Sequence, residues 1–360
     1  MGVRAGRLSG HMIKLFFRLL ALVLCFAVCA ILAVSQDGLK QPLRLVQTIS
    51  LPNVKGRLDH MEVDVQRQRL FVAGLENGTF EVVDLKTGKW MRSIPEFKKP
   101  QGALFVLEFN KLFLASGYDG MVRVFRADTL QLLDSIQFEP GPNRIVYEPN
   151  SKLVYVGYGG KDAGKDYGEV GIIDAKNNKH IGDVKVNAHP SELLLNKSGT
   201  TLFVFISIAN QLQVVETNKR EVVSTWPITS QRPGDAAFDE STSRLFVGTR
   251  TPAELIVMDS KSGKEVAHLP TADGQDGVYF DEVRQRVYVS GGRELPNGFV
   301  YVYLQKSADR YENIAKVPTR GGAGTSFWSP ELNRYYVAAP ANEKEDAAIL
   351  VYEPVDWRSP

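Results

Sequence analysis

One short apolar segment recurs seven times along the chain, and polar or turn-forming residues flank every copy. It reads Arg69-Leu-Phe-Val-Ala-Gly74 in the first copy and Arg334-Tyr-Tyr-Val-Ala-Ala339 in the last. The first apolar residue of each copy defines a series of anchors: Leu70, Leu112, Leu153, Leu202, Leu245, Val287 and Tyr335. Successive anchors are 42, 41, 49, 43, 42 and 48 residues apart. Apolar runs that return every 40–50 residues or so predict the four-stranded blades of a β-propeller.

Each repeat except the last contains four predicted strands. In the fifth repeat they cover residues 233–240, 244–249, 254–259 and 265–269. Short apolar runs separated by Gly, Pro, Asn and Asp are typical of hairpins. The link Asp259-Ser-Lys-Ser-Gly-Lys264 matches Asp84-Leu-Lys-Thr-Gly-Lys89 in the first repeat. Its glycine supplies the positive φ that the turn between the third and fourth strands needs.

The last repeat lacks a fourth strand. The segment 43–51 at the other end of the chain, Leu-Arg-Leu-Val-Gln-Thr-Ile-Ser-Leu, has the pattern of the missing strand. An N-terminal strand that completes the last blade would close the ring and remove two open sheet edges. The sequence therefore predicts an all-β fold, a seven-bladed β-propeller of four-stranded antiparallel blades closed in this way.

The first 35 residues differ from the rest. Four basic residues precede or begin an uninterrupted apolar run over residues 19–34, and small residues stand at Ala33 and Ser35. This pattern predicts a signal peptide over residues 1–35, cleaved before Gln36, and a single propeller domain over 36–360. An uncleaved membrane anchor is the alternative, because the run nearly spans a bilayer.

Cysteine content and charge argue against several kinds of chemistry and partner. Both cysteines, Cys25 and Cys29, lie in the N-terminal segment, so we expect neither a disulfide nor thiolate chemistry in the mature chain. Four of the 43 basic residues also lie there, which leaves 39 against 41 acidic ones. Nothing in this balance favours a nucleic-acid partner.

The repeats resemble those of the YVTN-type, YncE-like seven-bladed propellers of bacterial envelopes. The resemblance covers about residues 43–354 and rests on the Leu-Tyr/Phe-Val strand, the Asp-x-x-x-Gly-Lys turn and entries such as Ala188-His-Pro190; the nearest form of the name motif is Val287-Tyr-Val-Ser290. It implies a periplasmic or secreted monomer that binds a small ligand or an envelope protein. A membrane would be touched only through an uncleaved N-terminal segment.

The candidate site lies where each repeat begins its first strand, because those strands surround the central channel of a propeller. The residues ten positions before the anchors are His60, Gly102, Asn143, Glu192, Asp235, Gly277 and Thr325. Asp59 and Asp276 precede two of them, and Arg57, Arg144 and Arg232 stand nearby. Three positions further on the residues are apolar, among them Val146, Phe238 and Phe280, and are expected in the core. We predict a ligand site formed by His60, Asn143, Arg144, Glu192, Arg232, Asp235 and Asp276, in which arginines hold an anionic group.

Two further interpretations of this cluster stay open. Polar residues at a channel mouth can simply be hydrated. His60, Glu192 and Asp235 could instead bind a divalent metal, Zn²⁺ or Ca²⁺, although no compact ligand spacing indicates one.

Two functions follow. The first is a non-enzymatic binding scaffold whose ligand or partner docks on the channel face. The alternative is a lactonase-like hydrolase or lyase, with His60 as general base and Glu192 or Asp235 orienting it or binding a metal. The segment Gly159-Gly-Lys-Asp-Ala-Gly-Lys-Asp166 is no phosphate-binding loop, because Asp166 stands where Ser or Thr is required.

Overall fold

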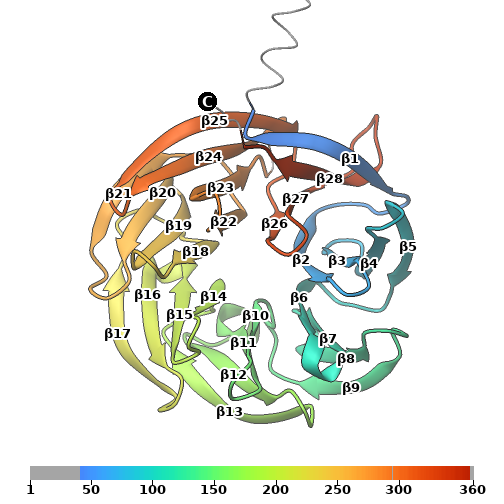
Figure 1. Cartoon of the computed structure of the whole chain (residues 1–360). Coiled ribbons are helices and arrows are strands. Elements are labelled where there is room, and N and C mark those ends of the chain that lie inside the picture. Colours follow the sequence, from blue (N-terminus) through green and yellow to red (C-terminus); the bar gives the residue numbers. More distant parts are fainter. Residues whose placement is uncertain (1–40, 294, 357–360) are drawn as a thin grey trace, which may run out of the picture. The chain divides into compact units, whose positions relative to one another are not determined.

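The computed structural model describes residues 41–293 and 295–356. The chain divides into two units, Leu45–Pro354 and a second unit formed by residues 1–44 and 355–360. In the second unit, the amide of Val355 donates a hydrogen bond to the carbonyl of Pro42 at 2.9 Å. Within the described residues, the first unit is a ring of seven four-stranded antiparallel sheets (Figure 1).

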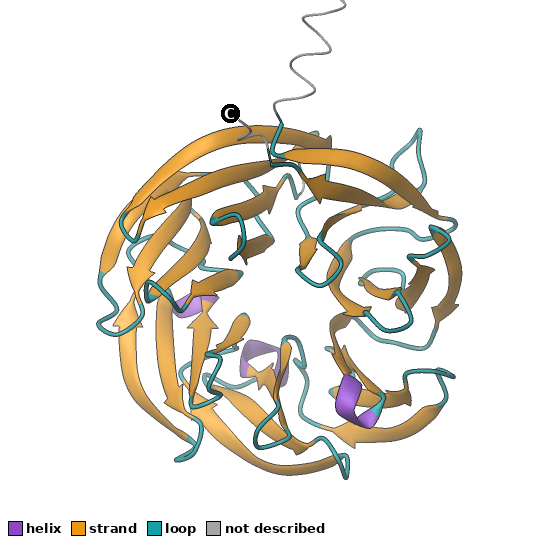
Figure 2. Ribbon diagram, viewed as in Figure 1, coloured by secondary structure: helices purple, strands orange, loops and turns teal. Residues whose placement is uncertain are grey.

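The blades follow one another along the chain, and each of the first six begins with its innermost strand (Figure 1). Strands and the loops between them make up most of the ring (Figure 2). The first three blades are β2 (Leu58–Asp64), β3 (Arg69–Gly74), β4 (Thr79–Asp84) and β5 (Lys89–Ile94); β6 (Pro100–Val106), β7 (Lys111–Ser116), β8 (Met121–Arg126) and β9 (Leu132–Gln137); and β10 (Ile145–Glu148), β11 (Leu153–Gly159), β12 (Gly168–Asp174) and β13 (Lys179–Val186). The next three are β14 (Glu192–Leu195), β15 (Thr201–Ile206), β16 (Gln211–Glu216) and β17 (Glu221–Pro227); β18 (Ala236–Asp239), β19 (Arg244–Arg250), β20 (Ala253–Asp259) and β21 (Glu265–Pro270); and β22 (Gly277–Asp281), β23 (Arg286–Gly291), β24 (Asn297–Ser307) and β25 (Arg310–Arg320). The last blade is β26 (Ser326–Ser329), β27 (Arg334–Ala339), β28 (Ala347–Pro354) and β1 (Leu43–Leu51), and short 3₁₀ turns are η1 (Leu107–Phe109), η2 (Gly160–Ala163) and η3 (Ser207–Ala209).

The N-terminal strand closes the ring. The last sheet has the order β1-β28-β27-β26, so β1 pairs with β28 as its outermost strand. Ile49 and Leu51 of β1 are buried, and they pack in one cluster with Tyr336 and Ile349 of the C-terminal strands. The predicted fold class, blade number and mode of closure are therefore confirmed.

The middle of the second strand of each blade is mostly apolar, and both of its faces are buried. Alternate side chains of a strand point to opposite faces of the sheet. In β3, Leu70 and Val72 pack in the cluster that contains the last blade's Tyr336. Phe71 and Ala73 pack in the cluster that contains Leu112 and Leu114 of the next blade. The recurring apolar segment thus joins each blade to its two neighbours.

A bulge recurs in the outer half of the blades, between the third and fourth strands. The pairing of the third with the fourth strand shifts register at least once in each of the first six blades, for example between Val82 and Val83 and between Val124 and Phe125. Such bulges increase the local twist of a strand. The turn just before the fourth strand has the predicted positive φ, 66° at Gly88 and 72° at Gly263.

Basic residues at the start of the second strand clasp the following blade. Arg69 donates to the carbonyls of Ala127 and Asp128. Lys111 donates to two carbonyls, of Ala175 and Lys176, and to the side chain of Asn178. These contacts connect the second strand of one blade to the outer turn of the next.

The predicted signal peptide, residues 1–35, lies outside the described residues. Among the residues that are described, no helix is both long and apolar enough to cross a membrane.

Candidate functional site

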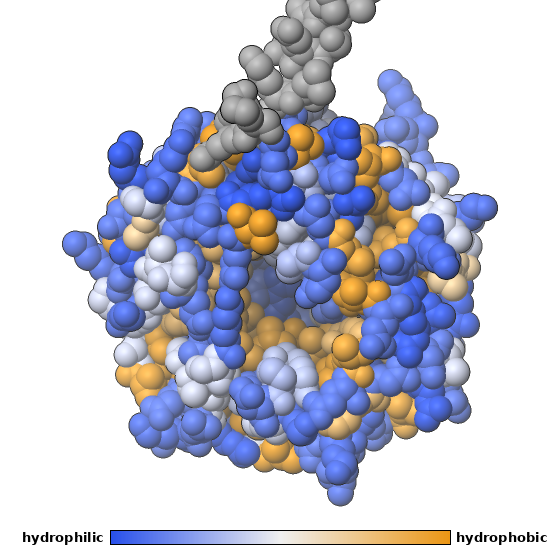
Figure 3. Space-filling view, viewed as in Figure 1, coloured by the Kyte–Doolittle hydropathy of each residue, from blue (hydrophilic) through white to orange (hydrophobic). Residues whose placement is uncertain are grey.

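The inner strands of the blades surround a central channel, and the face drawn in Figure 3 is hollowed at its centre. The predicted residues lie at the starts of these strands: His60 in β2, Glu192 at the start of β14, and Asn143, Arg144, Asp235 and Asp276 just before β10, β18 and β22. Gly102 occupies the equivalent position in the second blade. A Cβ atom there would lie 1.9 Å from the carbonyl oxygen of Asn143, so the close approach of two blades requires glycine.

A bulge brings the first blade's polar residues into the channel. The pairing of β2 with β3 shifts register between Leu58 and Met61, and the residues between them are Asp59 and His60. A bulge re-aims side chains relative to the regular alternation of a strand. Both side chains consequently line a channel cavity while they remain 1% and 7% exposed.

Three cavities follow one another along the channel. The outer groove has a volume of about 810 Å³ and is lined by loop residues that include Lys99, Lys161, Lys165 and Arg232. The ionic chamber, about 160 Å³, is lined by Arg57, Asp59, His60, Asn143, Asp235, Arg250, Asp276 and Arg293 among others. The lower cavity, about 280 Å³, is lined by His60, Arg144, Glu192, Tyr279 and mostly apolar residues. Arg250 and Asn143 border both the groove and the chamber, and His60 borders both the chamber and the lower cavity.

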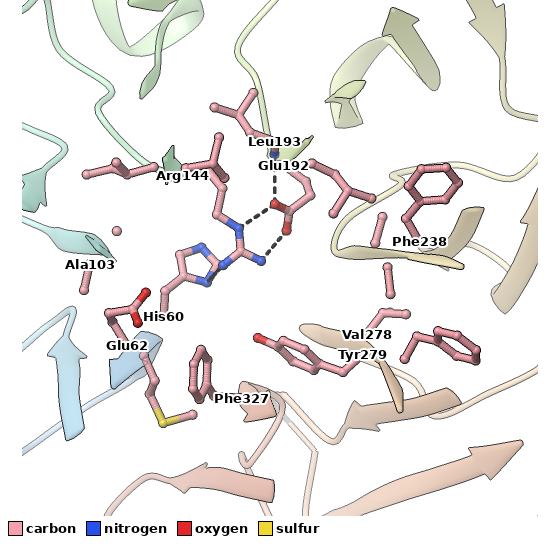
Figure 4. Close-up of a pocket in the computed structure, with 18 residues that line it drawn as sticks. His60, Glu62, Ala103, Arg144, Glu192, Leu193, Phe238, Val278, Tyr279 and Phe327 are labelled. Atoms are coloured by element: carbon pink, nitrogen blue, oxygen red, sulfur yellow. Dashed lines mark hydrogen bonds and ion pairs between the residues drawn. The ribbon is translucent and has the colours of Figure 1, made fainter. Parts of the chain in front are cut away.

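Arg144 is the hub of the predicted site (Figure 4). Its Nε donates to Oε1 of Glu192 at 2.6 Å, and its Nη2 contacts the other carboxylate oxygen of Glu192. Nη2 also lies 3.5 Å from Oδ2 of Asp235, and Nη1 lies 2.9 Å from Nδ1 of His60. Residues from blades one, three, four and five thus meet on one guanidinium group.

The pKa values of this cluster reflect burial first. Burial and the nearby charge of Arg144 lower the pKa of His60 to about 4, so His60 is neutral at pH 7. Burial raises the pKa of Glu192 to about 7, against the opposing effect of Arg144. Burial alone would lower the pKa of Arg144, but Glu192 and Asp235 raise it well above the usual value.

A second cluster in the chamber is centred on Asp276. Its Oδ2 accepts from Nη2 of Arg57 at 2.8 Å, and its Oδ1 accepts from Nη2 of Arg250 at 2.8 Å. Nη1 of Arg293 lies 3.8 Å from the same Oδ1. Burial would raise the pKa of Asp276, but these arginines lower it to about 2, so this carboxylate is ionised.

Asp59 stands beside this cluster with one oxygen unsatisfied. Its Oδ1 accepts from Nη2 of Arg57 at 3.0 Å. Its Oδ2 is buried and has no hydrogen-bond partner among the described residues, and the same holds for Nε of Arg57 and Oδ1 of Asn143. Burial raises the pKa of Asp59 above its usual value. Unsatisfied buried polar atoms are rare in folded proteins and call for an explanation.

The lower cavity has an apolar wall. Val146, Phe238 and Phe280 line it, and each also packs against a buried core cluster, in agreement with their expected place in the core. Glu62 lies on this wall, and burial raises its pKa to about 8. Tyr279 donates to the carbonyl of Ser326 at 2.9 Å.

The candidate metal ligands do not form a metal site. Among the described residues, no group of three or more His, Cys, Asp or Glu side chains is placed to hold an ion. The guanidinium of Arg144 contacts His60, Glu192 and Asp235, and it supplies the positive charge at their centre. A cation bound between the three would be repelled by this group.

The sequence pattern predicted most residues of the cluster but not Arg250, Arg293 and Glu62. Arg232 lines the outer groove and not the chamber. Arg250 and Arg293 were not predicted, although each follows the apolar part of a second strand, where the chain turns over the loop-bearing face. Glu62 was missed because it lies two residues further along β2 than His60.

Comparisons with known proteins agree with the fold. No protein-family model matches the chain. The chain is similar to Antigen Lp49 of Leptospira interrogans serogroup Icterohaemorrhagiae serovar copenhageni (strain Fiocruz L1-130), with 23% identity over 256 residues, 67% of this chain and 54% of that protein. It thus spans about half the length of this relative.

Solved structures with different roles share the architecture. A chain of the hydrazine synthase of Kuenenia stuttgartiensis superposes with a TM-score of 0.69 and 17% identity, over 80% of this chain and 94% of that one. A chain of the mitotic checkpoint complex gives a TM-score of 0.69 and 12% identity, over 87% and 92%. At such identities the likeness shows the fold alone, and propeller folds host many functions.

Proposed function

We propose that this chain is an exported propeller of the YVTN type that acts as a binding scaffold, with its ligand or envelope partner held on the loop-bearing channel face. The signal-like N-terminal segment and the repeat pattern support export and the family. The groove and chamber support binding, because they form one path from the rim to a buried set of charges.

One observation favours binding over catalysis: the groups that could do chemistry are engaged with arginines. Nδ1 of His60 faces a guanidinium donor, which takes the lone pair that a general base would use. Glu192 is held through both oxygens by Arg144, and both oxygens of Asp276 accept from arginines. Fixed charges of this kind suit recognition of a polar group.

The test is a thermal-shift screen of the mature protein, residues 36–360, against amino acids, carboxylates, phosphates, sugars and short peptides. A hit in wild type that is lost in Arg250→Gln and kept in Arg310→Gln would support the site, because Arg250 borders both cavities and Arg310 lies exposed on the outermost strand of its blade. Hits that are insensitive to Arg250→Gln would place binding elsewhere. Sequencing the N-terminus of exported protein tests cleavage before Gln36.

A hydrolase remains the second candidate because of Glu192. Its pKa of about 7 is suited to proton transfer at neutral pH. Turnover of lactone or ester substrates by the wild type, abolished in Glu192→Gln, would favour this activity. If the protein is a binding scaffold, the wild type should turn over none of these substrates.

A further inference from the structure

The ionic chamber carries equal numbers of positive and negative side chains. Arg57, Arg250 and Arg293 line it together with Asp59, Asp235 and Asp276. His60, the remaining titratable group on its wall, is neutral at pH 7 because its pKa lies near 4. Arg144 and Glu192 below them form an ion pair of their own. The chamber therefore has no net charge that would favour a simple anion or a simple cation.

The arginines of the chamber gather around one of its three carboxylates. The three arginines converge on the single carboxylate of Asp276, which forms a positive pole. Arg57 in addition has a buried Nε without an acceptor. A planar guanidinium offers five donors. Arg57 also donates to Asp59, and Arg250 also donates to the carbonyl of Gln275, but the donors of these two arginines exceed the contacts named. This side of the chamber can still receive a carboxylate.

The other pole consists of acceptors that have few donors, because Asp59 receives one hydrogen bond, from Arg57 to its Oδ1. Oδ2 of Asp59 has no hydrogen-bond partner in the described part of the chain, although the residue is only 1% exposed. Oδ1 of Asn143 also has none. Asp235 is held by a contact of 3.5 Å with Arg144, longer than a hydrogen bond between charged groups. Burying a carboxylate oxygen without a donor is costly, so these three groups call for an ammonium group or its equivalent.

We propose that the ionic chamber binds a small zwitterion of the α-amino-acid type, with its carboxylate toward Arg57 and Arg250 and its ammonium group toward Asp59 and Asp235. The inference rests on the proposed binding function and names its ligand class. The volume of about 160 Å³ is enough for several water molecules, and so for a ligand of a few non-hydrogen atoms. A larger side chain would extend past Arg250 into the outer groove.

Isothermal titration of the mature protein with glycine, L-alanine and L-glutamate tests the proposal, with acetate and ethylamine as probes that carry one charge each. At least one amino acid should bind at least ten-fold more tightly than either single-charge probe. Acetate that binds as tightly as the amino acids would make the chamber an anion site and overturn the proposal. Absence of binding by all three amino acids would overturn it as well.

Variants locate the two poles. Asp235→Asn and Arg250→Gln should each weaken amino-acid binding by ten-fold or more, while Arg310→Gln and Asp134→Asn, on exposed outer strands, should leave it unchanged. Circular dichroism and the melting temperature show whether each variant is folded, and Asp59→Asn provides a second test of the negative pole. Equal binding in wild type and all pole variants would refute the assignment.

The outcome also separates this inference from the broader function. If amino acids fail but another compound gives a thermal shift that depends on Arg250, the ligand class is wrong and the binding scaffold stands. If no compound or peptide gives such a shift, the proposed function fails with it.

Discussion

Nδ1 of His60 lies 2.9 Å from Nη1 of Arg144. A guanidinium group only donates hydrogen bonds, so this ring nitrogen must carry a lone pair and the proton must sit on Nε2. Nε2 is 4.0 Å from Oδ1 of Asp59. The Arg144 contact therefore fixes both the charge and the tautomer of His60, and it links the two halves of the channel cluster.

This contact predicts a pH dependence of stability. The pKa of His60 is about 4 in the folded state against 6.5 ordinarily, so below pH 6.5 the unfolded chain binds a proton that the folded chain does not. The contribution is fully present above pH 6.5 and is lost as the pH falls toward 4, by about 3 kcal/mol in all. Urea unfolding should show this loss in wild type and in the control His268→Gln, but not in His60→Gln. Parallel pH profiles for wild type and His60→Gln would contradict it.

Glu62 should act at the alkaline end. Burial raises its pKa to about 8, so between pH 4.5 and pH 8 the folded chain keeps a proton that the unfolded chain has lost. Stability from this group accordingly falls as the pH rises through that window. Between pH 6 and pH 9, the melting temperature of Glu62→Gln should fall less than the melting temperature of the wild type. The exposed Glu221→Gln serves as control, and identical slopes for Glu62→Gln and wild type would disprove the shift.

Removal of Arg144 should be more damaging than removal of its whole ion pair. Arg144→Met removes the guanidinium that neutralises the buried carboxylates of Glu192 and Asp235, at an expected cost of about 3–5 kcal/mol. Arg144→Met combined with Glu192→Met should regain a large part of this loss. Denaturant unfolding of the two variants measures the difference. A double variant as unstable as the single one would show that the cost arises from packing.

The clasp between blades two and three offers a test of ring stability. Lys111 donates three hydrogen bonds to the outer turn of the next blade. Lys111→Met leaves two carbonyls and the Asn178 side chain without this donor, and we expect a loss of about 1.5–3 kcal/mol. Lys89→Met, at an exposed position, is the matched control in chemical denaturation. Equal midpoints for the two variants would mean that water replaces the clasp.

Ring closure by β1 can be tested within that single strand. Leu51 is fully buried, whereas Leu45 is 50% exposed. Leu51→Ala should cost about 2–5 kcal/mol because it leaves a cavity, and Leu45→Ala should cost little. Equilibrium unfolding compares the two. Similar effects would indicate that β1 adds little to the stability of the last blade.

The sequence alone determined the ring and its closure. Its apolar segments recur at a regular spacing, and the alternation that places Leu70 and Phe71 on opposite faces is a local property of a strand. The need of the last blade for a fourth strand, met by residues 43–51, was also visible. The same regular spacing placed His60, Arg144, Glu192 and Asp235 at the starts of the inner strands.

Only the tertiary structure decided how those residues are used. Arg57 and Asp276 are 219 positions apart, and their ion pair exists because blades one and six face the same channel. The neutral state of His60 depends on burial and on Arg144 from another blade, and neither is encoded near His60 itself. Arg250 and Arg293 line the chamber because the chain turns toward the channel at the ends of β19 and β23. Local patterns determine strands, whereas charges and pKa values depend on which distant groups share a buried space.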